Sequence, residues 1–161
     1  MDTLLEHEIA GDEVPCLLLP IANGQLLLPT FTIAEMIHYR SPLQKVGQEK
    51  PKWFLGDLPW RGLTIPMLSF EVITGHNSPK IDNGSQIAIF NNPDINAKLP
   101  FFAIPTTGIP HLSRITPEGI LELTNDDLKP YETMRVDIAG DQAIIPNISA
   151  LLDACIELMG L

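Results

Sequence analysis

Residues 53–70 read WFLGDLPWRGLTIPMLSF, and this stretch decides the fold that the sequence predicts. Two apolar runs flank a turn at residues 59–62, which is the pattern of two short strands joined by a hairpin. The stretch contains a single cation, Arg61. Because an unpartnered charge in apolar surroundings is costly, we expect Arg61 to pair with a carboxylate. Glu35 is the favoured partner, since it lies in another apolar segment, IAEMI.

The pattern around this stretch occurs twice in the chain. LPTFTI at 28–33 resembles IPTTGI at 104–109, with the prolines and the isoleucines each 76 positions apart (105 − 29 and 109 − 33). Later in each half, Gly62 precedes IPML and Gly140 precedes IPNI, at an offset of 140 − 62 = 78. A repeat of this length indicates two copies of one supersecondary unit. We therefore predict two small β-barrel subdomains of similar design.

The remaining segments also read as short strands. The dipeptide Asn23-Gly24 favours a hairpin turn between strands at about 16–21 and 25–29. The 15 prolines and 11 glycines leave little room for long helices, so the fold class is all-β, or β-rich with one helix. The final segment, ISALLDACIELMG, places its apolar residues on one helical face and ends at a glycine. The predicted bounds are a flexible acidic tail at 1–13, one domain at 14–158, subdomains at about 14–75 and 84–146, and a helix at about 148–159 across their seam.

Charge and composition exclude several kinds of partner. The chain has 20 acidic and 10 basic residues, a formal net charge of −10, so neither nucleic acid nor an anionic membrane surface fits as its main partner. The N-terminus lacks a basic region, and no apolar run has the length of a membrane span. We expect a cytoplasmic protein without membrane insertion. Cys16 and Cys155 fit no metal-ligand or redox spacing and are expected to be buried thiols, with a disulfide between them as the minor alternative.

No catalytic motif occurs in the sequence. The four histidines, His7, His38, His76 and His111, are scattered without metal-ligand spacing. Phosphate-binding and nucleophile-elbow motifs are missing as well. We therefore predict no catalytic residues, no metal, no cofactor and no enzymatic activity. A hydrolase that uses His76 or His111 is the minor alternative.

Arg61 and Trp60 each allow two interpretations. Arg61 either contacts a partner at an exposed turn or clamps a carboxylate to hold two elements together. Trp60 is a candidate for an exposed binding anchor, because tryptophan is enriched at binding hot spots, but it could also pack inward at the turn.

Several segments together resemble the CheW-like family of chemotaxis coupling proteins over roughly residues 14–158. They are LLLPTFTIAEMI, FLGDLPWRGLTIPML, FFAIPTTGIPHL and IIPNISALL. The match is strongest at 53–70, where the positions in register with the family pattern are Gly56, Arg61, Gly62 and Pro66. The resemblance implies two intertwined five-stranded SH3-like β-barrels around a shared core, without a catalytic site.

The resemblance also implies partners. Such proteins join the cytoplasmic tips of methyl-accepting chemoreceptors, which bind in the groove between the barrels, to the regulatory domain of a CheA-type histidine kinase, which contacts the barrel ends. The partner-binding residues that we predict are Ile33, Glu35, Trp60, Arg61 and Gly62. Pro59, Trp60 and Ser69 depart from the family pattern, which fits a coupling protein of a pilus- or twitching-linked array as well as a flagellar one. A small-molecule-binding or other interaction module on the same fold is the alternative.

Overall fold

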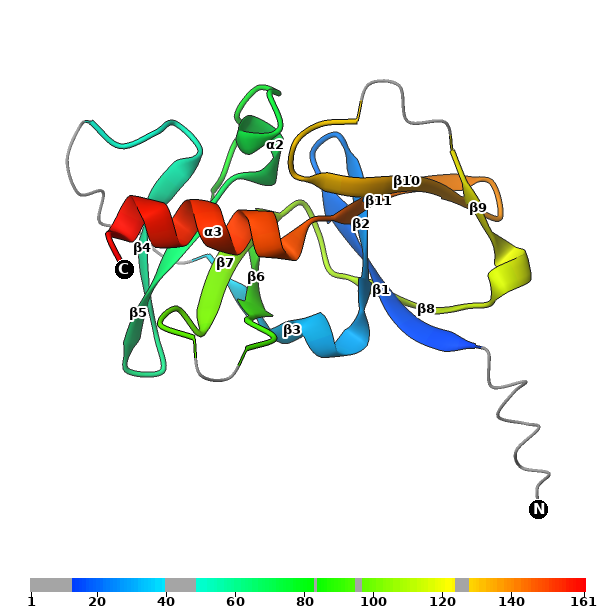
Figure 1. Cartoon of the computed structure of the whole chain (residues 1–161), viewed down its shortest axis with the longest axis horizontal. Coiled ribbons are helices and arrows are strands. Elements are labelled where there is room, and N and C mark those ends of the chain that lie inside the picture. Colours follow the sequence, from blue (N-terminus) through cyan, green and yellow to red (C-terminus); the bar gives the residue numbers. More distant parts are fainter. Residues whose placement is uncertain (1–12, 40–48, 83, 95–96, 124–127) are drawn as a thin grey trace, which may run out of the picture.

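The chain forms two β-sheets and a C-terminal helix (Figure 1). The computed structural model describes residues 13–39, 49–82, 84–94, 97–123 and 128–161. The predicted β-rich fold with two sheets and a short C-terminal helix is confirmed. The acidic tail expected at 1–13 lies, apart from Glu13, outside the described residues.

Sheet A has six strands in the order β8-β1-β2-β11-β10-β9, and sheet B has five in the order β3-β6-β7-β5-β4. The strands of sheet A are β1 (Val14–Ile21), β2 (Gly24–Pro29), β8 (His111–Ile115), β9 (Ile120–Glu122), β10 (Glu132–Ile138) and β11 (Asp141–Pro146). Those of sheet B are β3 (Ile33–His38), β4 (Phe54–Trp60), β5 (Leu63–Leu68), β6 (Gln86–Asn91) and β7 (Phe101–Thr106). The expectation of five strands in each unit holds for sheet B, whereas the short β9 adds a sixth strand to sheet A by pairing with β10.

The sequence repeat corresponds to a repeated series of strands. β3, β4 and β5 begin 78 residues before β8, β10 and β11 (111 − 33, 132 − 54 and 141 − 63). The hydrogen bonds repeat as well: the Ser69 N–H donates to the Trp53 carbonyl at 2.8 Å, and the Asn147 N–H to the Tyr131 carbonyl at 2.9 Å. The two copies therefore share local structure as well as sequence pattern.

Each sheet combines strands from both copies. Hairpin β1–β2 lies in sheet A beside β8, β11 and β10, whereas hairpin β6–β7 lies in sheet B with β3, β5 and β4. The expected division at about residues 75–84 therefore does not separate the two sheets. Apolar patterning identifies a strand but does not show which strand it will pair with. The two exchanged hairpins make equivalent pairings, because β2 is parallel to β11 and β7 is parallel to β5.

The turn of hairpin β4–β5 explains the repeated glycine. Arg61 and Gly62 both have positive φ angles, 50° and 78°, and Ala139 and Gly140 in hairpin β10–β11 have 53° and 95°. Two positive φ angles suit the twist of a two-residue hairpin turn, and glycine adopts such angles without strain. The first hairpin differs from the expected Asn23-Gly24 turn: Ile21 pairs with Gly24, so its turn residues are Ala22 and Asn23.

Three apolar clusters make up the core. One contains residues from every strand of sheet A, such as Val136, and another contains residues from every strand of sheet B, such as Ile87. Each sheet is therefore rolled around its own interior. The third cluster joins both sheets to the helix, with Leu19, Phe102 and Leu151 among its fully buried members.

Helix α3 (Ile148–Met159) covers this shared cluster (Figure 1). It occupies the range expected from the apolar spacing, begins after an Asn147 cap and ends at Gly160, whose φ is 72°. Cys155 on α3 and Cys16 on β1 are free, buried thiols. Burial raises the pKa of both, that of Cys155 to about 12, so neither thiolate is available at neutral pH.

Candidate functional site

Glu35, Trp60 and Arg61 form a connected polar cluster on sheet B. The Glu35 Oε1 atom accepts hydrogen bonds from Trp60 Nε1 at 3.0 Å, Arg61 Nε at 3.2 Å and Arg61 Nη2 at 3.0 Å. The expected Glu35–Arg61 ion pair is therefore present. The Trp60 contact was not foreseen, because sequence spacing does not show where an indole N–H will point.

The cluster joins the two edges of sheet B. Glu35 lies on β3 and Trp60 on β4, which are the first and last strands in the order of the sheet. A hydrogen bond between strands at opposite edges requires that the sheet curl until those edges meet. The cluster therefore joins these two edges of the rolled sheet through side chains, and among the described residues β3 and β4 are not paired by a backbone ladder.

Trp60 is held in place on more than one side. Its ring meets Phe101 edge-on, with centroids 4.8 Å apart and an angle of 69° between the planes. The Arg61 guanidinium carbon lies 5.2 Å from the centre of the same ring. Trp60 is half-buried, and its ring packs inward against the interior of sheet B, as the second of the two interpretations has it. Arg61 is the exposed member, with 68% of its side chain accessible.

The surroundings of Glu35 favour its charged form. The hydrogen bond from Trp60, followed by that from Arg61, lowers the pKa of the Glu35 carboxyl below its ordinary value of 4.5. The three contacts are therefore complete above pH 4.5 and are lost as the pH falls further, through the pKa of the folded protein.

An acid titration followed by NMR tests this coupling. We expect the indole N–H resonance of Trp60 to shift as the pH falls below 4.5, because its acceptor becomes protonated. The resonance of Trp53, the other tryptophan, is the internal control. In the Glu35→Gln variant the Trp60 resonance should no longer move. An equal shift in both proteins, while each remains folded, would contradict the assignment.

The other two predicted site residues have different surroundings. Gly62 completes the exposed turn next to Arg61. Ile33 begins β3, but a bulge separates it from Glu35 in the pairing with β6. Ile33 therefore packs against the shared cluster instead of joining the polar one. The structure brings together Glu35, Trp60, Arg61 and Gly62, and it places Ile33 apart from them.

The sequence reasoning missed a set of exposed apolar residues. Phe31 and Ile109, with accessibilities of 76% and 63%, each lie two residues before an equivalent strand, β3 or β8. Leu112 on β8 is 64% exposed. Both copies carry an apolar residue just before the equivalent strand, and this could have been noticed in the sequence. It was missed because the offset between the two copies changes along the chain from 76 to 78.

Neither a metal site nor a membrane span is found in the described part of the chain. No group of three or more His, Cys, Asp or Glu side chains among those residues could hold a metal ion. None of the described helices is long and apolar enough to cross a membrane. His111 lies exposed on edge strand β8, and His76 lies on the segment that follows helix α2 (Phe70–Ile73).

Two rolled sheets around a shared core, with a charged hairpin closing one of them, define a double-barrel β domain. The chain matches the CheW-like domain family over residues 15–155. It therefore belongs to that family, whose members are scaffold adaptors and not enzymes.

A solved structure shows the same fold. The chain is similar to the scaffolding protein TtCheW from Thermoanaerobacter tengcongensis, with a TM-score of 0.67 and 16% sequence identity. The similarity covers 83% of this chain and 88% of that chain. At this identity the likeness concerns the fold alone. No curated protein sequence matches the chain.

Proposed function

We propose that this protein is a non-enzymatic scaffold that couples chemoreceptor signalling tips to the regulatory domain of a CheA-type histidine kinase. Membership of the CheW-like family over residues 15–155 is the observation that carries the proposal. In this role the protein would act in the cytoplasm and join membrane receptor arrays through its partners.

The asymmetry of the polar cluster supports a binding role for it. In the second copy, at an offset of 78, the positions of Glu35, Trp60 and Arg61 are occupied by Ser113, Ile138 and Ala139. Hairpin β10–β11 forms its turn with Ala139 at a similar φ, so the turn does not require an arginine. We propose that the exposed side chain of Arg61 contacts the kinase regulatory domain, and that Glu35 and Trp60 hold Arg61 in position.

The exposed apolar residues fit the second partner. Phe31, Ile109 and Leu112 present large apolar side chains beside the equivalent strands β3 and β8. Exposed apolar groups of this kind are a common feature of docking surfaces for apolar helix faces. We assign them to the receptor tip, together with Ile33, which packs against the shared cluster.

The departures from the family pattern are not equivalent in their effects. Ser69 is fully buried and caps α2, accepting a hydrogen bond from the Val72 N–H at 3.2 Å, so it cannot touch a partner. We therefore leave Ser69 out of the proposal for partner choice. Pro59 is exposed on edge strand β4, where it removes a backbone donor and discourages further strand pairing. We propose that Pro59 and Trp60 determine partner choice, including whether the protein serves a pilus-linked or a flagellar array.

Binding to kinase and receptor fragments from the same cell tests the proposal. We expect Arg61→Glu to weaken binding of the kinase regulatory domain about tenfold, because it reverses an interface charge, and Glu35→Arg to act similarly. The double exchange should restore part of the loss, since the ion pair re-forms but Trp60 Nε1 loses its acceptor.

Asp153→Arg, which reverses an exposed charge on α3, is the matched control and should bind normally. Isothermal titration calorimetry measures each affinity. Failure of the unaltered protein to bind any kinase regulatory domain or receptor tip of that cell would refute the scaffold function. Independent effects of the two single changes would refute the coupling between Glu35 and Arg61.

A further inference from the structure

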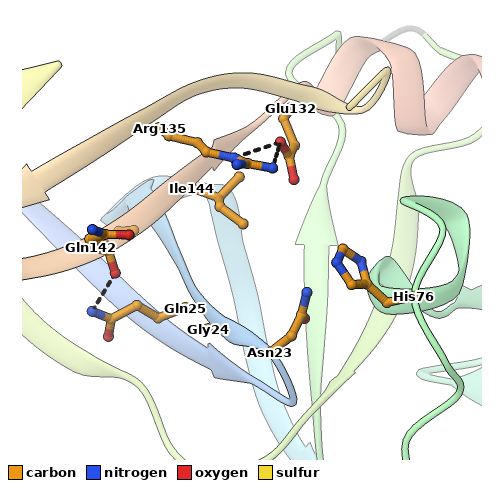
Figure 2. Close-up of a pocket in the computed structure, with 9 residues that line it drawn as sticks. Asn23, Gly24, Gln25, His76, Glu132, Arg135, Gln142 and Ile144 are labelled. Atoms are coloured by element: carbon orange, nitrogen blue, oxygen red, sulfur yellow. Dashed lines mark hydrogen bonds and ion pairs between the residues drawn. The ribbon is translucent and has the colours of Figure 1, made fainter. Parts of the chain in front are cut away.

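Figure 2 shows a polar cavity of about 230 Å³, whose lining residues do not include those of the Glu35 cluster. Its walls come from the turn of hairpin β1–β2, from strands β10 and β11, and from the segment after α2. The polar side chains that line it are Asn23, Gln25, His76, Glu132, Arg135 and Gln142.

Glu132 is the buried member of this set. Only 1% of its side chain is accessible. Its Oε1 atom accepts from the Lys129 N–H at 3.1 Å, from Arg135 Nε at 3.1 Å and from Arg135 Nη2 at 3.0 Å. Its Oε2 atom is buried and has no hydrogen-bond partner in the described structure.

The unpartnered oxygen marks the cavity as a place for a hydrogen-bond donor. A buried carboxylate oxygen without a donor is costly, because it has lost its contacts with bulk water. Figure 2 shows Oε2 of Glu132 on the side turned toward His76 and Asn23, away from the contact with Arg135. A donor that enters the cavity from the side of His76 would meet this oxygen.

The other lining groups determine the kind of ligand. Arg135 forms an ion pair with the buried Glu132, so a positive and a negative group both line the cavity. Asn23, Gln25 and Gln142 carry amides, each of which both donates and accepts. An anionic ligand would face the bare oxygen of Glu132, and a cationic one would face the Arg135 guanidinium. The lining therefore favours a neutral ligand that both donates and accepts.

His76 adds an acceptor to this set. Its Nδ1 lies 3.3 Å from the Thr74 hydroxyl oxygen. That hydroxyl donates its proton to the Phe70 carbonyl at 2.7 Å, so Nδ1 is the donor in the contact with Thr74. In the neutral imidazole, Nε2 is then an acceptor.

We propose that this cavity binds a small neutral polyhydroxylated molecule, such as a polyol or a monosaccharide. Hydroxyl groups would donate to Glu132 Oε2 and His76 Nε2 and accept from the amides of Asn23 and Gln142. This binding is separate from the scaffold role, because none of the residues involved belongs to the Glu35 cluster or to the exposed apolar set.

NMR titration of the isotope-labelled protein tests the site. The probes are myo-inositol, glucose and glycerol, with glucosamine and gluconate as charged counterparts. We expect at least one neutral probe to give saturable shifts at residues 23–25, 76 and 132–144, and the charged counterparts to give smaller ones. The single variants His76→Ala and Gln142→Ala should each weaken binding about tenfold, the equivalent of one or two lost hydrogen bonds.

His111→Ala, which removes another exposed histidine from β8, is the matched control and should leave binding unchanged. Glu132→Gln, checked for folding by circular dichroism, should abolish the shifts, because its amide places a donor where an acceptor is needed. The proposal is wrong if no neutral probe shifts these resonances, if the charged probes bind as well, or if His76→Ala and Gln142→Ala bind like the unaltered protein.

Discussion

The Leu151→Ala variant is expected to lose about 3 kcal/mol of its free energy of unfolding. Leu151 on α3 is fully buried in the cluster that also contains Leu19 of sheet A and Phe102 of sheet B. Removing its side chain leaves a cavity where the helix and both sheets meet, and neighbours in a packed core fill such a cavity only in part.

Urea denaturation measures this loss. Met159→Ala is the matched control on the same helix, since Met159 is 36% exposed and its truncation should change the free energy by less than about 0.5 kcal/mol. If Leu151→Ala behaved like the control, α3 would not be part of the shared core. In that case the helix could be removed without unfolding the two sheets.

The Glu71→Ala variant is expected to lose about 2 kcal/mol, the contribution of hydrogen bonds to a charged acceptor. Glu71 lies on α2, directly after sheet B, and is 1% exposed. Its Oε2 accepts from the N–H of Ala22 at 2.7 Å, in the turn of hairpin β1–β2 of sheet A, and its Oε1 accepts from the Ser69 hydroxyl at 3.2 Å. One carboxylate therefore links α2 to the other sheet.

Glu71→Gln separates the hydrogen bond from the volume of the side chain. The amide oxygen can still accept from the Ala22 N–H, so this variant should lose less than Glu71→Ala in the same urea experiment. Glu118→Ala, which removes an exposed carboxylate, should have little effect. Equal losses for the Gln and Ala variants would show that the contact with Ala22 does not depend on a carbonyl-type acceptor at position 71.

The candidate site could be predicted only in part from the sequence. Arg61 was recognisable because a lone cation in an apolar stretch requires a carboxylate, and Glu35 was the carboxylate in a similar setting. Ile33 was grouped with Glu35 because of the resemblance to the CheW-like family. On a regular strand, residues two apart would also share a face. The bulge between them breaks that alternation, and no residue type in the segment announces it.

Glu71 and Glu132 were not recognised, because a carboxylate in a polar-looking segment gives no sign that it will be buried. Their burial depends on what the chain brings over them from far away. Glu71 meets a turn 49 residues earlier in the chain. Glu132 lies beside a cavity that also includes Asn23 and His76.

The sequence by itself determined the strands, the repeated hairpins and the C-terminal helix, because apolar spacing, turn glycines and caps act over a few residues. Gly62 and Gly140 occupy equivalent turns, and Gly160 ends the helix as expected. Only the tertiary structure decided which hairpin enters which sheet and which edges of sheet B meet. Those choices depend on pairings between strands far apart in the chain, and the local spacing of residues carries no information about such pairings. The Glu35–Trp60–Arg61 cluster exists because the closing of sheet B brings β3 and β4 together.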